Sequence, residues 1–251
     1  MASIPSHQQK ETKYNPLSDK SVFEDFSDQV RRAAYQKKEI ILYGCIHKDS
    51  LQMLKQRLDG LCDPGEVPFS EHEMVAYFRP NGKEKSLTIR FRRKFPGVDS
   101  FMHMKYIGNP EIDNKCPCIV RSRIDSVSKS GEYMDFMRRL GLRVDFEYIA
   151  NGFARTRGTI VVTVYQISKI IELGNYQQTN IKPFGDCHII EMSIMMPYLN
   201  DHIASAKMLR DFADQFHPYV FMLCFRFYCI CPQDNTKHPY ISIDVAQISL
   251  I

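Results

Sequence analysis

Residues 73–93 read EMVAYFRPNGKEKSLTIRFRR, and this stretch decides the fold class. The runs Glu73–Phe78 and Leu87–Arg93 are rich in aromatic and β-branched residues and flank the turn Pro80–Lys83. Because Asn-Gly within such a turn is a strong hairpin signal, the stretch predicts two paired antiparallel strands. Two sets of side chains alternate along the second strand: Leu87, Ile89 and Phe91, and Thr88, Arg90 and Arg92. One face of the predicted sheet is therefore apolar and the other is mainly basic.

Short runs of similar composition recur along most of the chain. Six further segments predict strands: Glu39–Ile46, Phe101–Ile107, Ile119–Val127, Val144–Ile149, Thr159–Ile167 and Cys187–Met196. Three segments predict helices: Leu51 to just before Gly60, capped by Asp49 or Ser50, then Gly131–Leu140, and Asp201–Phe216. About eight short strands with few helices predict a β-rich α+β fold, a single closed antiparallel β-barrel with flanking helices.

Several predicted strands carry charged side chains along one face: Arg90, Arg92, Lys105, Arg121, Arg123, Glu147 and Glu191. In a closed barrel these side chains would line a polar lumen, because a barrel has an interior as well as an exterior face. On an open sheet they would simply face solvent. The sequence leaves both arrangements open.

The composition is that of a folded chain. Of the 251 residues, 44% are apolar and 25% are charged, close to the averages for globular proteins. A formal net charge of +4 argues against a dedicated nucleic-acid binder, which would carry a dense basic face. No apolar run approaches the roughly 20 residues of a membrane span, so none is expected. Cys45, Cys62 and Cys187 lie in apolar runs and are interpreted as small buried hydrophobes in a reducing compartment.

Changes in composition divide the chain into three parts. Residues 1–38 form a polar extension, partly disordered, with an amphipathic helix expected at about 19–35. Residues 39–219 carry the strand and helix patterns and are assigned to the barrel domain. Residues 220–251 are an apolar, β-prone tail, which is an aggregation hazard unless it is covered.

Residues 54–63 read LKQRLDGLCD and resemble the L-x-x-R-L-x-G-L-C-D signature of the Mediator subunit 18 family. Further positions match in order: His72–Val75, Arg90, Arg92–Arg93, Tyr106, Gly108, Pro110–Glu111, Val120–Arg121, Asp125, Phe136, Gly141, Phe146–Glu147, Gly152, Gly158, Val164–Tyr165, Phe212–Gln215 and Pro218. Their order and spacing from Glu39 to Tyr219 are specific, although no single motif is decisive.

The resemblance implies a nuclear, non-enzymatic structural subunit of the Mediator head module. It implies an eight-stranded barrel like that of metal-dependent triphosphate hydrolases, and a heterodimer with Mediator subunit 20. It also implies a tether through the C-terminal helix of Mediator subunit 8. The remainder of the head module and the RNA polymerase II machinery would complete the assembly, which bridges activators and the polymerase. No cofactor, metal, catalytic residue, membrane contact or sequence-specific nucleic-acid contact is expected.

Partner contact is assigned to six apolar residues on two elements, which would bury one surface on a partner and offer a groove to a partner helix. They are Val161, Val162, Val164 and Tyr165 of the predicted strand Thr159–Ile167, and Met208 and Phe212 of the predicted helix Asp201–Phe216. The same apolar pattern would also suit a core position, so both interpretations stand.

Two other functions compete with the scaffold. A triphosphate hydrolase would need paired glutamates for divalent cations, for which Glu71-x-Glu73 is a candidate. A single-strand nucleic-acid binder would use the basic, aromatic stretch Arg90–Phe95. Cys116-x-Cys118 and Cys229-x-Cys231 invite a zinc interpretation, but their spacing is wrong for common structural sites.

Overall fold

The computed structural model describes residues 35–79, 87–97, 101–111, 113, 115–128 and 132–223. The chain divides into two compact units, Met1–Tyr35 and Gln36–Ile251, and the barrel lies in the second. Three predicted features fall outside the described residues: the helix at 19–35 apart from its last residue, the turn Pro80–Lys83 and the Cys229-x-Cys231 motif. Among the described helices, none combines the length and apolar character needed to cross a membrane.

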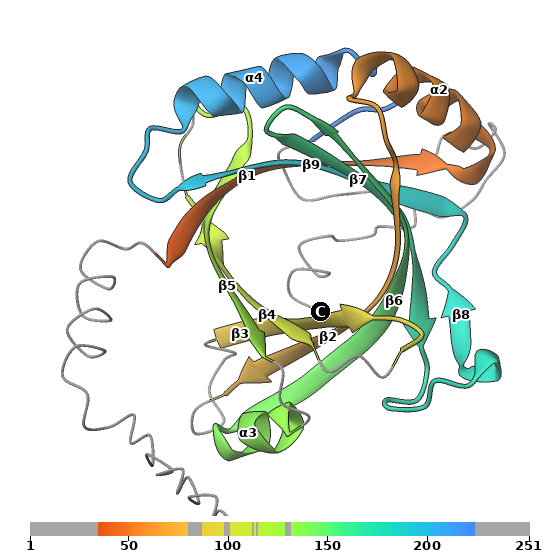
Figure 1. Ribbon diagram of the computed structural model, residues 1–251, viewed down its shortest axis with the longest axis vertical. Coiled ribbons are helices and arrows are strands. Elements are labelled where there is room, and N and C mark those ends of the chain that lie inside the picture. The colour runs from red at the N-terminus through yellow and green to blue at the C-terminus, as the bar shows by residue number, and fades with distance from the viewer. Residues whose placement is uncertain are drawn as a thin grey trace, which may run out of the picture. The chain divides into compact units, whose positions relative to one another are not determined.

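Eight antiparallel strands close into a barrel, as predicted (Figure 1). Their bounds are β1 Gln36–His47, β2 Val67–Phe78, β3 Leu87–Lys94, β4 Met102–Pro110, β5 Ile119–Ser128, β6 Leu142–Arg157, β7 Ile160–Ile170 and β9 Cys187–Pro197. They pair in the order β6-β2-β3-β4-β5-β1-β9-β7, and β7 pairs with β6 to close the ring. The short strand β8, Ile181–Pro183, was not predicted and pairs only with the end of β7.

The hairpin that decided the fold class pairs in one continuous register, from Glu71 opposite Lys94 to Phe78 opposite Leu87. The largest difference from the sequence-based bounds is β6, which runs 16 residues where only Val144–Ile149 was expected. Gly152 lies inside this strand because β7 crosses it closely: a Cβ atom there would lie 2.0 Å from the Val164 carbonyl oxygen. The glycine therefore serves a close approach of two strands.

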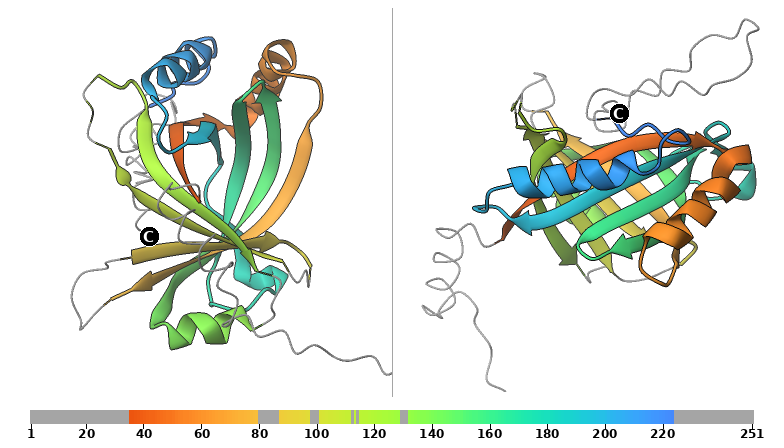
Figure 2. Two further views of the ribbon diagram at one scale, coloured as in Figure 1. Left: turned by 60° about the vertical axis from the view of Figure 1, so that its left-hand side comes forward. Right: turned by 90° about the horizontal axis from the view of Figure 1, so that it is seen from above.

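Three helices pack on the outer face of the barrel: α2 Leu51–Leu61, α3 Tyr133–Arg139 and α4 Ile203–Asp214. Figures 1 and 2 place α2 and α4 on one side of the ring and α3 on the other. The expected caps differ in detail. Ser50 makes no capping hydrogen bond, Gly60 lies within α2, and Asp201 accepts a hydrogen bond from the Ile203 amide (3.2 Å). Short 3-10 turns lie at Lys48–Ser50 and Gln178–Asn180.

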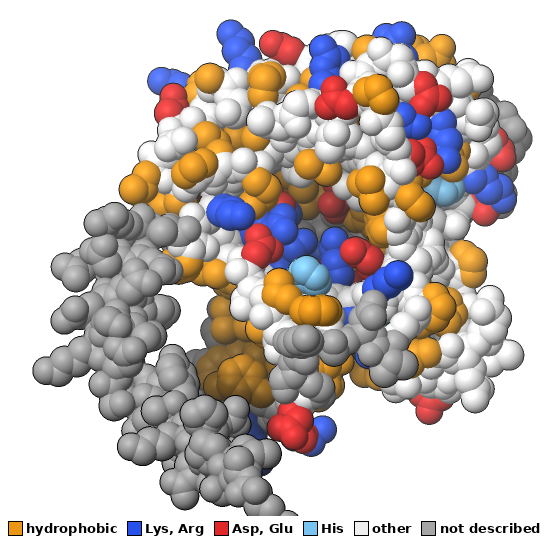
Figure 3. Space-filling model, in the orientation of Figure 1, with side chains coloured by type: hydrophobic (Ala, Val, Ile, Leu, Met, Phe, Trp, Pro, Cys, Tyr) orange, Lys and Arg blue, Asp and Glu red, His pale blue; other side chains and the backbone are white. Residues whose placement is uncertain are grey.

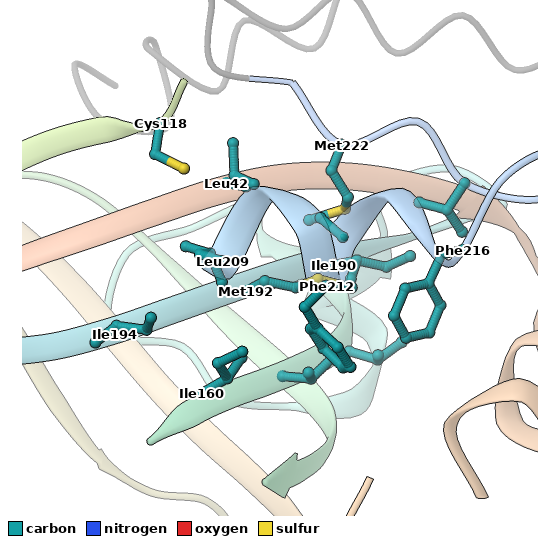
Figure 4. Packing of buried hydrophobic residues seen from close by; sticks show 14 of the residues in the cluster. Leu42, Cys118, Ile160, Ile190, Met192, Ile194, Leu209, Phe212, Phe216 and Met222 are labelled. Carbon is teal, nitrogen blue, oxygen red and sulfur yellow. The ribbon is translucent and has the colours of Figure 1, made fainter. Parts of the chain in front are cut away.

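The main hydrophobic core lies between α4, α2 and the outer faces of β1, β7 and β9. Figure 4 shows Leu209, Phe212 and Phe216 close to Ile190 and Met192 of β9. All five side chains are at most 3% exposed. A second cluster joins α3 to β2, β3 and β6 through Met137, Met74, Phe91 and Leu142. These two clusters pack between the outer strand faces and the helices, whereas a third cluster, which includes Val75, Ile167 and Ile189, lies on the inner strand faces.

The barrel domain extends beyond both expected boundaries. Its first strand begins at Gln36, three residues before the expected boundary. At the other end, Val220 and Met222 are 1% and 3% exposed and belong to the main core. Tyr43 and Leu223 exchange two backbone hydrogen bonds, of 3.2 and 2.7 Å. Residues 220–223, which the sequence assigned to a separate tail, are therefore part of the barrel.

Two cysteines differ from their interpretation as buried thiols. Cys45 on β1 and Cys187 on β9 are disulfide-bonded, and they lie on neighbouring strands two positions apart in register. A cysteine within an apolar run looks the same in the sequence whether it is a free thiol or part of a disulfide. The third, Cys62, is a half-buried free thiol, and burial raises its pKa.

Candidate functional site

The charged faces of the strands point into the barrel, which decides between the two arrangements left open by the sequence. Figure 3 shows Lys, Arg, Asp and Glu gathered at a hollow in the middle of one face. Alternation along β3 places Arg90 and Arg92 on the inner face and Phe91 on the outer one, where Phe91 is 1% exposed. The lumen therefore holds clusters of buried ionic groups next to an apolar cluster, while the other two apolar clusters lie outside the barrel wall. The inner apolar cluster consists of Val75, Tyr148, Ala150, Tyr165, Ile167 and Ile189.

The first interior cluster is centred on Glu73, which is 1% exposed. Its Oε1 accepts hydrogen bonds from Arg90 Nη1 (2.9 Å) and Tyr148 Oη (2.7 Å). Its Oε2 accepts two from Arg92, of 2.9 and 2.7 Å. Burial alone would raise the pKa of this carboxyl, but the two guanidinium groups outweigh it and hold the pKa well below its usual value. Glu73 is therefore a carboxylate with every lone pair engaged.

The second cluster is centred on Glu39 of β1. Arg121 Nε donates to Oε2 and Arg123 Nη1 donates to Oε1, both at 2.7 Å. Burial opposes ionisation, but these two arginines more than offset it and lower the pKa of Glu39 to about 2. Arg121 also donates to Tyr43 Oη (2.7 Å). Arg123 also donates to Asp125 (2.9 Å).

A cavity of about 160 Å³ lies between the two clusters. Four cations line it, Arg90, Arg92, Lys105 and Arg123, and so do three carboxylates and one histidine, Glu71, Glu73, Asp125 and His103. The lining cations thus exceed the lining carboxylates by 4 − 3 = 1. Burial, together with the charges of Arg92 and Arg123, lowers the pKa of Lys105 to about 8.

The geometry does not favour the hydrolase alternative. Glu73, the carboxylate that would hold a divalent cation, has four hydrogen bonds from Arg90, Arg92 and Tyr148. Glu71, the other half of the pair, is bound by Arg92 (3.1 Å). Within the described part of the chain, no group of three or more His, Cys, Asp or Glu residues could hold a metal ion. This also covers Cys116-x-Cys118, whose Cys118 thiol donates to the Ala206 carbonyl (3.2 Å).

The nucleic-acid alternative is not favoured either, for a different reason. A stacking surface needs aromatic and basic side chains on the same exposed face. In the stretch Arg90–Phe95, Arg90 and Arg92 are bound by Glu73 inside the barrel, whereas Phe91 is buried beneath α3 on the outside. Strand alternation therefore places Arg90 and Arg92 on the opposite face from Phe91. Arg93 and Phe95 of the same stretch lie outside, where both pack against the ring of Tyr176.

Glu147 does not belong to the lumen, in contrast to the prediction. Its neighbour Tyr148 points inward, so Glu147 points outward, where it is 4% exposed. There Oε2 lies 2.7 Å from His72 Nε2, and Oε1 accepts from the Gly174 amide. Tyr176 Oη also donates to Oε2 (3.1 Å). The cluster joins the loop after β7 to the barrel wall; sequence reasoning missed it because His72 and Glu147 are 75 residues apart.

The six residues assigned to partner contact are brought to three different places. Val162, Val164 and Phe212 are at most 3% exposed and lie in the main core. Tyr165 faces the lumen, where its hydroxyl donates to Glu191 (2.7 Å). These four are corrected to interior positions, because an apolar stripe looks the same for core and surface. Val161 (36% exposed) lies on the same lumen-facing side of β7 as Tyr165, so of the six residues only Met208 (45% exposed) lies exposed on the outside of the barrel.

Comparison with known proteins gives a consistent result. The sequence profile of the family described as Med18 protein matches residues 99–225. The Mediator of RNA polymerase II transcription subunit 18 of Caenorhabditis elegans is 39% identical over 197 residues, which cover 77% of this chain and 85% of the nematode protein. The Drosophila melanogaster protein of the same name is 33% identical over 185 residues, covering 72% and 83%.

One solved structure supports the same fold. A chain in the structure of the Schizosaccharomyces pombe Mediator head module superposes with a TM-score of 0.59 at 17% identity. The superposition covers 74% of this chain and 97% of the fission-yeast chain. It bears on the fold alone.

Proposed function

The chain belongs to the Mediator subunit 18 family, and on that basis we propose that it acts as a non-enzymatic, nuclear scaffold in the Mediator head module. The observation that carries the proposal is 39% identity over 85% of a curated relative with that name. The barrel interior agrees with a scaffold, because the carboxylates of a potential hydrolase are bound by arginines. The bridging of activators and RNA polymerase II follows from membership of this complex.

The proposed partners are Mediator subunit 20, as the second half of a heterodimer, and the C-terminal helix of Mediator subunit 8. Among the residues assigned to contact, Met208 is the most exposed and lies on α4. An exposed methionine on a helix gives a partner an adaptable apolar contact. A permanent interface of this class should bury more than about 2,000 Å² in total.

The experiment is co-expression with subunit 20 and the C-terminal segment of subunit 8, followed by size-exclusion chromatography at moderate salt. Co-elution as a stoichiometric complex supports the scaffold. A monomer that ignores both partners refutes it. The shortened chain for this experiment should end after Leu223 and not at Tyr219, because Val220 and Met222 belong to the core.

A matched pair of variants tests the contact surface. Met208→Asp places a charge on the proposed surface, and Phe136→Asp places one at a comparably exposed apolar position of α3 (57% exposed). We expect Met208→Asp to weaken co-elution and Phe136→Asp to leave it unchanged, with both variants keeping the circular dichroism of the native barrel. Equal behaviour of the two would remove Met208 from the interface.

A second measurement addresses catalysis directly. If the barrel were a triphosphate hydrolase, it would release phosphate from a nucleoside triphosphate with magnesium or manganese, and Glu73→Gln would abolish the release. We expect no release above a buffer control. Activity that depends on Glu73 would overturn the non-enzymatic proposal while leaving the assembly experiment unaffected.

A further inference from the structure

The end of β7 and the short strand β8 form a two-stranded ribbon in which two lysines lie directly opposite each other. Lys169 of β7 is the register partner of Lys182 of β8, and both side chains are exposed. Directly opposite residues of antiparallel strands have Cβ atoms roughly 4.5–5.5 Å apart, a distance at which like charges destabilise the pairing. In the part of the chain that the structure describes, neither ammonium forms an ion pair with a carboxylate. The ribbon therefore carries an unfavourable pair of positive charges.

The carboxylates near the ribbon in the sequence or in the register are engaged elsewhere. Glu172 Oε2 accepts a hydrogen bond from Asn175 Nδ2 (2.9 Å). Asp186 is paired with Lys48 (2.8 Å). Glu147 points to the other face of the sheet, where its contacts are those described above. A counter-charge for the lysine pair would therefore come from another molecule.

Two exposed apolar side chains flank the lysine pair on the same face. Ile171 lies two residues after Lys169 and is 55% exposed, and Phe184 lies two residues after Lys182 and is 43% exposed. Side chains two positions apart on a strand point to the same face. Backbone hydrogen bonds from the amides of Ile171 and Phe184 to the opposite strand, of 3.1 and 2.8 Å, keep both residues in the ladder. We call these four residues the ribbon patch; it continues the side of β7 that carries Tyr165 past the end of the β7–β9 pairing.

The loop that joins the two strands of the ribbon is held by its own hydrogen bonds. Asn180 Oδ1 accepts from the Glu172 amide (3.1 Å), and its Nδ2 donates to the carbonyls of Glu172 and Asn175 (2.9 and 2.7 Å). Tyr176 Oη ties the loop to Glu147 of the barrel wall (3.1 Å). A surface that is already ordered loses less conformational entropy when a partner binds. The ribbon patch is therefore preorganised for contact.

We propose that the ribbon patch binds an acidic peptide segment of a partner protein, which places a carboxylate between the two ammonium groups and apolar side chains against Ile171 and Phe184. A nucleic acid fits less well, because its binding relies on rows of cations that contact many phosphates, whereas the described residues supply two lysines on this face. The site is additional to the contact surface proposed on α4. Figure 1 shows β8 beside the ring on the right, whereas α4 covers the top.

The test uses the full chain and a fluorescein-labelled peptide in which aspartates alternate with leucines. A second peptide, with asparagine in place of each aspartate, is the control. Fluorescence anisotropy at moderate salt should show binding of the acidic peptide and at least about fivefold weaker binding of the asparagine peptide. Replacing both lysines, as Lys169→Gln with Lys182→Gln, should weaken binding of the acidic peptide by about fivefold, as expected for the loss of two exposed ion pairs. Lys207→Gln, at an exposed position of α4, should leave it unchanged.

Lys182→Glu separates a binding role of the lysine pair from a structural one. The variant places opposite charges at the directly opposing positions, which stabilises a strand pair. We expect the urea midpoint, followed by far-UV circular dichroism, to rise while the affinity for the acidic peptide falls. A lowered midpoint would assign the lysines to the fold and overturn the proposal. Equal binding of the two peptides, or full binding by the double variant, would overturn it too, as would a single-stranded oligonucleotide that binds the ribbon patch more tightly than the acidic peptide.

Discussion

Cutting the chain after Tyr219 should destabilise the barrel severely compared with cutting it after Leu223. The two proteins differ by only four residues, Val220–Leu223. Within this segment Val220 and Met222 are 1% and 3% exposed and pack in the main core. Gly44 of β1 makes room for them: a Cβ atom there would lie 2.4 Å from Met222 Sδ and 2.9 Å from Val220 Cγ1.

The magnitude follows from the groups that are lost. Burying a side chain such as Val or Met contributes about 1.5–3 kcal/mol, so the two together contribute about 3–6 kcal/mol on that scale. The shorter protein also loses both backbone hydrogen bonds between Tyr43 and Leu223. The hydrogen bond from Arg210 to the Met222 carbonyl (2.6 Å) is lost as well. A domain of this kind has about 5–15 kcal/mol of stability in all, so the shorter protein should be marginal at best.

Urea unfolding followed by far-UV circular dichroism is the appropriate assay, because the chain contains no tryptophan to report by fluorescence. The free energy of unfolding of the protein ending at Tyr219 should be several kcal/mol below that of the protein ending at Leu223, or the shorter protein should fail to fold. Midpoints that agree for the two shortened proteins would refute the assignment of residues 220–223 to the core.

Three further outcomes are expected. The pKa of Glu39 is about 2 in the fold against 4.5 in the unfolded chain, so its contribution to stability is present above pH 4.5 and is lost as the pH falls toward 2. Glu39→Gln should lower the free energy of unfolding by about 3 kcal/mol at pH 7. In acid titrations followed by circular dichroism, the stability of this variant should also fall less steeply with decreasing pH than that of the wild type. The pKa of Lys105 is about 8 in the fold against 10.5 unfolded, so the unfolded state binds more protons and stability should rise between pH 8 and 10; Lys105→Met should remove that rise in urea titrations at each pH. Gly44→Ala should lower the urea midpoint because its Cβ would meet Met222. Gly60→Ala should raise the free energy of unfolding by about 0.5–1 kcal/mol, because Gly60 lies within α2 and no atom lies within 4 Å of its Cβ position; the reverse order of the two midpoints would contradict this reasoning.

Local sequence patterns predicted the barrel well because side chains along each strand point alternately to the inside and the outside of the barrel, which leaves a period of two in the sequence. The hairpin at 73–93, the eight long strands and the three helices were all recognisable from two simple periods in the sequence. The strand β8 was missed because three residues, Ile181–Pro183, are too few to carry a pattern. The extent of β6 was underestimated because Gly152, a residue that usually weakens a strand, is needed where β7 approaches.

The candidate sites were harder to predict because the same residue pattern suits opposite locations. Val162 and Val164 alternate with Val161 and Tyr165 along β7, and only the closed sheet determines which pair meets α4 and which meets the lumen. Glu147 was assigned to the lumen with the arginines, yet it faces outward to His72. Long-range pairings of this kind leave no periodic trace in the sequence, so they could be found only from the structure.

Two large apolar clusters lie outside the barrel wall and buried ion pairs lie inside it. With apolar faces outside, helices α2, α3 and α4 must cover the strands, and these helices then present the surfaces that a partner can reach. Inside the barrel, four arginines hold Glu39 and Glu73 in ion pairs. Buried ion pairs often add little to stability compared with apolar packing. Replacing a single glutamate or arginine of a pair, in contrast, leaves the other charge buried without a counter-charge. Single substitutions in this network should therefore be strongly destabilising. The two buried glutamates thus tie β1 to β5 and β2 to β3 from the inside, while apolar packing of the helices holds the barrel wall from the outside.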